Sequence, residues 1–403
     1  MATKGGGRMR NTGRFLIDAR RLDVGGAVGP ARGITMKKSN KAVFIGGEIY
    51  RQAAYGNNHP LTIQRVGPVM DVCRDMGWLD DEAFAESPQA SWEELIRFHA
   101  PAYVDAVIEA DQVGRANAKL RENYGLGTQE NPVFTGLYER AATSCGGSIH
   151  AAERVLDGGC AYNPAGGTHH GQPAKASGFC YFNDPVLSIY RLLDVGMARV
   201  LYLDLDAHHG DGVEYAFADD PRVATISIHE QDRWPHSGTA SDPQRNIWNF
   251  PVPSGFSDAE LRFLMEAAVM PVHAGFSPDA VVVTCGADGL AGDPLSTMNL
   301  SNVALWSAVE SVRDATMRTV ILGGGGYNPW TVTRCWAGLW AVLAGHDVHE
   351  PLTGAVAAIL GEFESDLVDE EDVLPAWFAT IADIPKDTAV RPSIERLALR
   401  QAA

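Results

Sequence analysis

A carboxylate and an imidazole stand at the end of an apolar run near the middle of the chain. Residues 200–212 read VLYLDLDAHHGDG, which puts Asp206 and His208 two positions apart. Alternate side chains of a β-strand share a face, so both groups can reach one cation where the strand ends. Taken alone, the pair is explained equally well by two side chains that cap a loop.

Two further clusters favour a metal site. Residues 281–289, VVVTCGADG, have the composition of a buried strand that ends at Asp288, a candidate third ligand. Two carboxylates and one imidazole leave coordination open for a water or a substrate oxygen, as a catalytic zinc site requires. His169 and His170 are adjacent in the glycine-rich segment GGTHHG, where histidines seldom serve packing. The sequence therefore predicts a metal-dependent active site.

The elements that must carry these groups alternate along the chain. Apolar, strand-like runs occur at 42–45, 200–205, 223–228, 280–284 and 319–322. Helical patterns occur near 137–157, 183–195, 258–274, 301–315 and 330–345. Strands that are apolar throughout are typical of parallel sheets covered on both faces, and the alternation predicts an α/β fold with a doubly wound sheet. Ligands bind such sheets beyond the carboxyl ends of the strands, where the polar clusters fall.

The chain of 403 residues is long enough for one large α/β domain or two ordinary ones. We predict a single catalytic domain over 36–385, after an N-terminal extension at 1–35 and before a C-terminal tail at 386–403. Residues 393–402 of this tail have a helical pattern, and the acidic stretch 362–372 is interpreted as a solvated surface segment.

Composition argues against several classes of protein. The formal net charge of −17 disfavours non-specific binding to nucleic acid or to an anionic membrane, because both reward a basic surface. It suits basic partners such as lysine-bearing protein segments. No apolar run approaches the roughly 20 residues of a membrane span. The six cysteines lack short paired spacing, which favours a reducing compartment, the cytoplasm, over a disulfide framework.

Residues 1–35 are expected to be disordered and dispensable. They contain seven Lys or Arg, two acids and many glycines, and they lack the apolar core of a secretory signal. Since they show no helical or strand period, they should add little to a packed core. A protein that starts at Met36 should keep the thermal midpoint and the turnover of the full chain, measured side by side. Loss of soluble protein or of activity would contradict this prediction.

In the order of its motifs the chain resembles the zinc-dependent histone deacetylases, in the branch that includes the bacterial acetoin-utilisation deacetylases. The matching segments are GGTHH at 166–170, ASGFCYFND at 176–184, DLDAHHGDG at 204–212, CGAD at 285–288, and GGGGY at 323–327 followed by RCW at 334–336. The resemblance implies the single-domain arginase/deacetylase fold, with a mostly parallel, eight-stranded sheet flanked by helices. It also implies removal of acetyl or related acyl groups from the ε-amino group of lysine in proteins or peptides, with release of acetate.

The resemblance implies how the site residues share this work. Amide hydrolysis needs an activated water, a polarised carbonyl and an acid for the departing amine. Asp206, His208 and Asp288 would hold Zn²⁺, or Fe²⁺, since histidine and carboxylate ligands suit both ions. His170 would be the general base and later the acid, and His169 an electrostatic and orienting partner.

Carboxylates are expected behind both histidines, because proton-shuttling histidines are usually held in one tautomer. By resemblance Asp204 lies behind His169 and Asp211 behind His170, although a turn would also explain an aspartate between two glycines. The resemblance further implies a structural K⁺ site formed by Asp204, the Ser227 hydroxyl and backbone carbonyls.

Tyr327 follows four glycines, which let the backbone bend sharply and set a phenol beside a ligand. By itself a tyrosine in this position would be a packing residue. By resemblance its hydroxyl donates to the oxyanion that forms during hydrolysis.

By resemblance the walls of a narrow channel for an aliphatic lysine or polyamine stem are Phe179 and Trp234. Gly178 would offer its carbonyl to this channel and Leu295 would line its mouth. The Trp234 wall departs from the family pattern of two aromatics followed by Pro-Gly-Thr-Gly, because residues 233–238 read RWPHSG. Rim shape and acyl preference therefore stay open. Arg65 resembles the arginine that guards an acetate exit cavity.

Other functions are weighed against this one. A rim carboxylate that grips the substrate backbone in several family members has only Asp111 as a candidate, with the wrong spacing. An acetylpolyamine amidohydrolase is the alternative enzyme. An arginase-like ureohydrolase with two manganese ions is disfavoured because Gly286 and Leu290 stand two residues before and after Asp288 and the bridging acid is missing. A non-catalytic acyl-lysine binding protein would be expected to have lost a site residue. The oligomeric state stays open.

Overall fold

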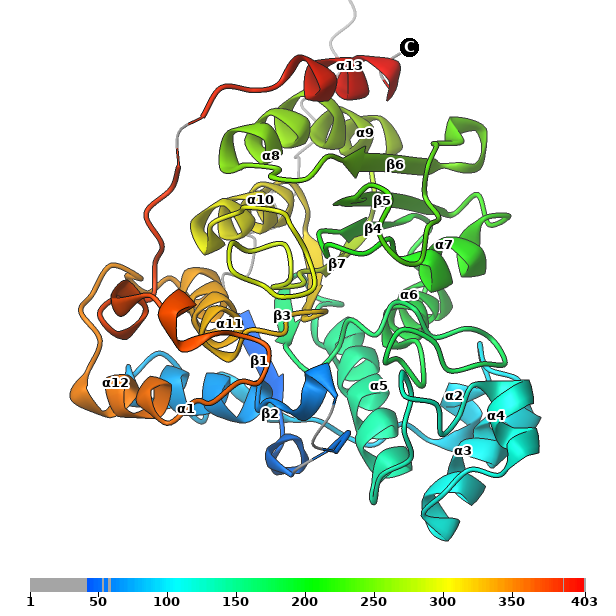
Figure 1. Ribbon diagram of the computed structural model, residues 1–403. Coiled ribbons are helices and arrows are strands. Elements are labelled where there is room, and N and C mark those ends of the chain that lie inside the picture. The colour runs from blue at the N-terminus through cyan, green and yellow to red at the C-terminus, as the bar shows by residue number, and fades with distance from the viewer. Residues whose placement is uncertain (1–41, 53, 57–58, 387, 402–403) are drawn as a thin grey trace, which may run out of the picture. The chain divides into compact units, whose positions relative to one another are not determined.

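The computed structural model describes residues 42–401 except 53, 57, 58 and 387, and the extension predicted at 1–35 lies outside the described residues (Figure 1). The described residues form an eight-stranded sheet in the order β2-β1-β3-β8-β7-β4-β5-β6, in which each neighbouring pair is parallel. This arrangement confirms the predicted fold class. The strands are β1 (Ala42–Gly46), β2 (Phe84–Glu86), β3 (Gly159–Asn163), β4 (Val200–Asp204), β5 (Val223–Glu230), β6 (Ile247–Val252), β7 (Ala280–Thr284) and β8 (Arg318–Leu322).

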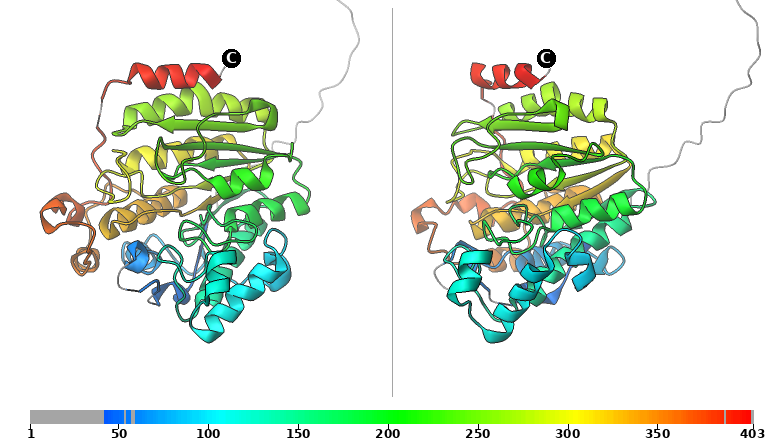
Figure 2. Two further views of the ribbon diagram at one scale, coloured as in Figure 1. Left: turned by 45° about the vertical axis from the view of Figure 1, so that its right-hand side comes forward. Right: turned by 90° about the vertical axis from the view of Figure 1, so that its right-hand side faces the viewer.

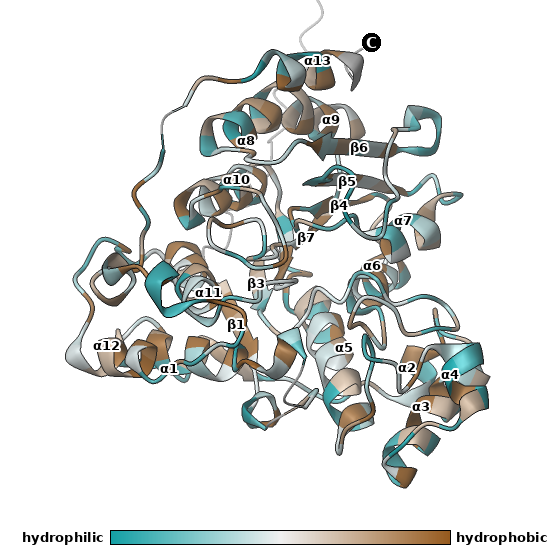
Figure 3. Ribbon diagram, in the orientation of Figure 1, coloured by the Kyte–Doolittle hydropathy of each residue, from teal (hydrophilic) through white to brown (hydrophobic). Residues whose placement is uncertain are grey.

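Helices cover both faces of this sheet (Figures 1 and 2). One face packs against α1 (Val66–Asp75), α8 (Asp258–Leu264), α9 (Met270–Phe276), α10 (Asn302–Ala315) and α11 (Pro329–Ala344), with α12 (Gly354–Gly361) beside α1. The other face packs against α5 (Leu137–Arg154), α6 (Asp184–Asp194) and α7 (Asp211–Phe217). A third core joins α5 to α2 (Trp92–Leu95), α3 (Pro101–Val113) and α4 (Ala118–Tyr124). Figure 3 shows the mostly hydrophilic α4 at the periphery, away from the sheet.

The central strands are apolar on both sides because each side meets a helical layer. In β4, Leu201 and Leu203 belong to the core under α1 and α11, whereas Val200 and Tyr202 belong to the core under α5 and α6. Burying one such aliphatic side chain is worth about 1.5–3 kcal/mol. The unbroken apolar runs in the sequence therefore mark strands in the middle of a covered sheet.

The shorter elements connect these layers. Turns of 3₁₀-helix lie at η1 (Glu48–Arg51), η2 (Pro60–Thr62), η3 (Pro243–Arg245), η5 (Glu370–Asp372) and η6 (Pro375–Phe378), and a π-helical turn, η4 (Met265–Val269), interrupts the helix predicted over 258–274. The other predicted helices appear as α5, α6, α10 and α11. The acidic side chains of 362–372 are exposed, as predicted.

The last helix, α13 (Pro392–Gln401), packs on α8, η4 and β6, and Figure 2 shows it beside α8 and α9 in both views. Arg391 anchors its start, with Nε and Nη2 2.5 and 2.6 Å from the two carboxylate oxygens of Glu260. The six cysteines are free and buried. Among the residues that the structure describes, no helix combines the length and apolar character that a membrane span needs.

The strand order brings distant polar segments together at one edge. β8, β7, β4 and β5 are neighbours, and Asp204 pairs with Thr284 of β7 and Ser227 of β5. Because all these strands are parallel, the loops after their carboxyl ends meet there. The segments that carry Asp206, Asp288 and Tyr327 are therefore adjacent in space.

Candidate metal-dependent active site

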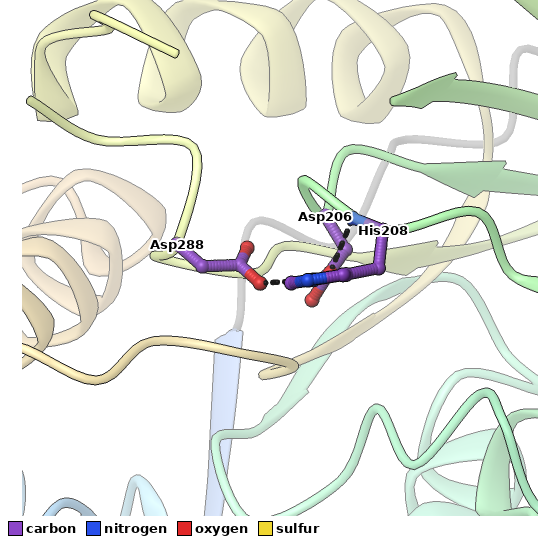
Figure 4. Close-up of side chains that lie close together, drawn as sticks. All are labelled: Asp206, His208 and Asp288. Atoms are coloured by element: carbon purple, nitrogen blue, oxygen red, sulfur yellow. Dashed lines mark hydrogen bonds and ion pairs between the residues drawn. The ribbon is translucent and has the colours of Figure 1, made fainter. Parts of the chain in front are cut away.

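Three potential metal ligands converge at the carboxyl ends of β4 and β7. Asp206 and His208 extend from the loop after β4 and Asp288 from the loop after β7 (Figure 4). One ligand atom from each lies within 4.8 Å of the others. His208 Nδ1 is 2.8 Å from Asp288 Oδ2 and 3.3 Å from Asp206 Oδ1. The structure thus brings together the three predicted ligands.

These residues fit a divalent ion. Burial, together with the neighbouring carboxylate of Asp206, raises the pKa of Asp288 to about 6, and a bound dication would favour the ionised form of both carboxylates. Ligand atoms about 2.1 Å from a tetrahedral ion lie roughly 3.4 Å apart; the 3.3 Å between His208 Nδ1 and Asp206 Oδ1 is close to this spacing, and the 2.8 Å between His208 Nδ1 and Asp288 Oδ2 is shorter. The outer oxygens are already occupied: Asp206 Oδ2 accepts from Gly325 N at 2.6 Å, and Asp288 Oδ1 accepts from Ala207 N at 2.9 Å.

The glycines around the cluster leave no room for further ligand side chains at their own positions. A Cβ on Gly286 would lie 2.2 Å from Asp206 Oδ2 and 2.8 Å from Asp288 Oδ1. A Cβ on Gly325 would lie 2.2 Å from Asp288 Oδ2. Asp293, the acid that follows Asp288 in the chain, uses its carboxylate to accept from the backbone N–H groups of Tyr327 and Leu295, at 2.7 and 2.9 Å. This packing disfavours the bridging acids of a two-metal centre.

Each histidine of the pair has a carboxylate behind it. His169 Nδ1 is 2.7 Å from Asp204 Oδ2, and His170 Nδ1 is 2.7 Å from Asp211 Oδ1. Both rings are buried, with centroids 3.9 Å apart. The structure therefore contains both predicted pairs, His169 with Asp204 and His170 with Asp211.

The two histidines differ in their electrostatics. Burial opposes the charged form of His169, but Asp204 and Asp206 outweigh it and raise the pKa of this imidazole to about 9. Burial and the charge of His169 lower the pKa of His170 to about 3, against the opposing effect of Asp211. His170 is therefore the imidazole that is neutral near pH 7 and able to accept a proton.

A tight loop presents both histidines. Asp184 accepts from Gly167 N at 3.0 Å and Thr168 N at 2.7 Å, and Asn183 Nδ2 donates to His169 O at 3.1 Å. Gly167 has φ +90°, and a Cβ there would lie 2.6 Å from the Gly323 backbone. Only glycine allows this approach, which joins the histidine loop to the tyrosine loop.

A cavity of about 640 Å³ reaches His208, one of the three candidate metal ligands. The predicted channel residues Gly178, Phe179, Trp234 and Leu295 all line it, and so do the buried side chains of His170, His208 and Tyr327. The remaining lining residues are Glu130, Glu230, Gln231, Asp232 and Arg233. Burial, then Asp288 and Asp206, raise the pKa of Tyr327 well above its usual range, so this phenol keeps its proton.

The Phe179 wall depends on an unusual backbone. Gly178 and Phe179 both have positive φ, +55° and +66°, a region that costs a non-glycine residue energy and persists where surrounding contacts impose it. A Cβ on Gly178 would lie 2.4 Å from Trp234 and 2.5 Å from His170. Glu130 Oε1 accepts from Gly178 N at 2.6 Å and is one of the contacts that hold this turn.

Glu130 also lines the cavity, as do Glu230 and Asp232. Asp111, the nearest candidate in the sequence, accepts from Gly136 N at 2.9 Å and Tyr138 N at 3.0 Å, so it holds the start of α5 and is not among the residues that line the cavity. Glu130 was missed because a single acid in an irregular loop, two residues before Pro132, carries no spacing signal. Its position follows from the packing of that loop on Gly178.

The remaining predicted residues lie close to the site. Arg65 Nη1 donates to Gly324 O at 2.9 Å, its guanidinium lies over Trp336, and it lines a second, smaller cavity that shares Phe179 with the channel. Ser227 lies opposite Asp204 in the β4–β5 register, and its Oγ is 2.8 Å from His229 Nδ1.

The fold and the site together define a class of protein. A family model described as the histone deacetylase domain matches residues 59–343, well over half of the chain. The chain therefore belongs to the histone deacetylase family, whose members are metal-dependent deacetylases, hydrolases of acetylated substrates.

Individual relatives support this assignment. Acetoin utilization protein AcuC of Bacillus subtilis is 34% identical over 322 residues, which are 76% of this chain and 83% of that protein. Histone deacetylase RPD3 of Saccharomyces cerevisiae is 36% identical over 317 residues, 75% of this chain and 72% of that protein. The crystal structure of an HDAC homolog from Aquifex aeolicus matches with a TM-score of 0.86 at 33% identity and covers 90% of this chain and 100% of that one.

Proposed function

We propose that this protein is a zinc-dependent deacetylase that removes the acetyl group from the ε-amino group of lysine in proteins or peptides. One observation carries the proposal: Asp206, His208 and Asp288 converge beside an aromatic-walled cavity that His208, His170 and Tyr327 line. An aliphatic lysine stem suits the apolar walls formed by Phe179 and Trp234.

The residues of this site can carry out amide hydrolysis. Asp206, His208 and Asp288 would hold Zn²⁺, which would supply a Lewis acid for the acetyl carbonyl and lower the pKa of a water. Neutral His170 takes a proton from that water as it attacks the carbonyl carbon, and the Tyr327 hydroxyl donates to the developing oxyanion.

Transfer of this proton to the leaving amine completes the reaction. His170 returns it to the amine nitrogen as the C–N bond breaks, so that a free amine and acetate leave. Asp211 holds Nδ1–H of His170 throughout, which keeps Nε2 available for transfer. Positively charged His169 adds to the electrostatic stabilisation of negative charge in the cavity.

Several accompanying assignments belong to this proposal. Acetate would leave past Arg65 through the smaller cavity, and K⁺ would bind at Asp204 and Ser227. Fe²⁺ in place of Zn²⁺ suits the same ligands. The protein would act in the cytoplasm without direct binding of nucleic acid.

Acetylated polyamines are the second candidate substrates. Glu130 and Asp232 both line the mouth, where carboxylates suit the additional ammonium group of a polyamine. The Arg233 guanidinium pairs with Glu230, with Nε 2.5 Å from Oε2. It therefore neutralises Glu230 and not Glu130 or Asp232. A side-by-side assay with acetyl-lysine peptide, longer acyl-lysines and acetylputrescine, with metal measured on the same sample, tests the choice. Preferred turnover of acetylputrescine would overturn the lysine assignment.

Glu130→Gln should weaken peptide binding more than it slows chemistry. The amide oxygen can still accept from Gly178 N, while the charge that would attract a backbone N–H or a cation is lost. A hydrogen bond to a charged group contributes about 1.5–3 kcal/mol, so KM for an acetyl-lysine peptide should rise roughly tenfold with little change in kcat. Steady-state kinetics check this, and an unchanged KM would remove Glu130 from substrate recognition.

A further inference from the structure

A side-chain amide holds the far side of the carboxylate behind His170. Asp211 Oδ1 faces His170 Nδ1 at 2.7 Å, and Asp211 Oδ2 accepts from Gln172 Nε2 at 2.9 Å. The same amide nitrogen donates to the backbone oxygen of His170 at 3.2 Å. Gln172 thus joins the general base to its carboxylate through both the side chain and the backbone.

The backbone of Gln172 is itself fixed in a tight turn. Its N–H donates to Lys175 O at 3.0 Å. Its carbonyl oxygen lies 3.0 Å from His99 Nδ1, and His99 Nε2 accepts from Asn183 N at 3.0 Å. Since Nε2 accepts, Nδ1 carries the hydrogen and donates to Gln172. The amide is therefore presented to Asp211 from a rigid support.

The two carboxylates behind the histidines are held differently. The Asp204 side chain is fully buried and accepts from Tyr202 Oη at 2.7 Å and from Asp206 N at 3.1 Å, besides facing His169. The Asp211 side chain is 23% exposed at the start of the short helix α7. Within the described residues, its side-chain oxygens bond to His170 and Gln172. The terminal torsion of aspartate is broad and two-fold, so this carboxylate needs a second anchor.

We propose that Gln172 is a positioning residue for the general base. By holding Asp211 Oδ2 it fixes the plane of the carboxylate, and the carboxylate in turn keeps the hydrogen of His170 on Nδ1 and the lone pair of Nε2 toward the substrate. This inference rests on the proposed function, because it takes His170 as the group that accepts the proton.

Two variants of Gln172 distinguish the effect of its hydrogen-bond donor from the effect of its side-chain size. Gln172→Met keeps the length of the side chain and removes the donor, and Gln172→Lys restores a donor to Asp211. Loss of an outer partner of a metal-ligating histidine typically costs about 10–100-fold, and we take the lower end for Gln172, whose amide acts on His170 through Asp211. Gln172→Met should therefore lower kcat on an acetyl-lysine peptide about tenfold with KM, metal content and thermal midpoint unchanged, while Gln172→Lys stays within about threefold of wild type. Lys175→Met, in the same turn but exposed, is the control and should match wild type.

A second readout does not depend on turnover. In a crystal structure of Gln172→Met the Asp211 carboxylate should be rotated away from His170, and in Gln172→Lys it should keep the wild-type position. An unrotated Asp211 in Gln172→Met, or a Lys variant as slow as the Met variant, overturns the inference. If the wild type turned over none of the acetylated substrates, the proposed function would fail, and the position of Asp211 in the two crystal structures would still decide the role of Gln172.

Discussion

Replacing Asp288 with asparagine should remove tight metal binding and turnover together. The carboxylate supplies one of two negative charges that face His208 Nδ1 in a buried site, and an amide is a neutral, weak ligand. Since buried charge must be neutralised by a partner, the remaining Asp206 and His208 would hold a dication poorly. Metal content per chain by mass spectrometry and kcat on an acetyl-lysine peptide should both fall below a few per cent of wild type.

The folded state should survive this substitution. Asparagine has nearly the volume of aspartate, and its Oδ1 can still accept from Ala207 N, so the circular dichroism spectrum should match that of metal-stripped wild type. Asp206→Asn should behave in the same way, whereas Asp366→Asn, the same chemical change on an exposed loop, should leave metal and rate unchanged. An Asp288→Asn protein with one tightly bound metal and normal turnover would exclude Asp288 as a ligand.

The candidate metal ligands could be predicted because their sequence signals are local. Asp206 and His208 share a strand-end spacing, and Asp288 ends an apolar run of its own, so each is marked by a few neighbouring residues. The parallel sheet then explains how they meet. The carboxylates behind the histidines could not be predicted from local composition alone. Asp211 lies between two glycines, which is typical of a turn, and its pairing with His170, which the structure contains, was predicted only from the family motif.

Elements that depend on long-range contacts were missed. β3 contains glycine, cysteine, alanine, tyrosine and asparagine and no β-branched residue, and it is a strand because β1 and β8 pair with it on either side. β6 includes Pro251, which lacks an N–H donor and is tolerated at a sheet edge. Glu130 belongs to the same class, because its place at the channel mouth is fixed by Gly178, far away in the sequence.

Replacing Tyr327 with phenylalanine should slow the reaction without disturbing the site. The ring lies 5.8 Å from that of Phe179 and is buried, and its backbone N–H is held by Asp293, so phenylalanine keeps the shape and the packing. What is lost is a hydroxyl that burial keeps protonated. A donor that bonds the developing oxyanion stabilises the transition state more than the ground state.

Loss of such a donor should therefore lower kcat. Removal of one oxyanion-hole donor lowers kcat roughly 10²–10³-fold, about 2.7–4 kcal/mol, so Tyr327→Phe should show this drop with full metal content and a much smaller change in KM. Steady-state kinetics and metal content on the same preparation check both. The result also separates the candidate functions, because an arginase-like centre would not depend on this phenol and an acyl-lysine binding protein would have no rate to lose. A phenylalanine variant with near-normal kcat on acetyl-lysine peptides would show that the oxyanion is stabilised by other groups, and the role proposed for Tyr327 would be wrong.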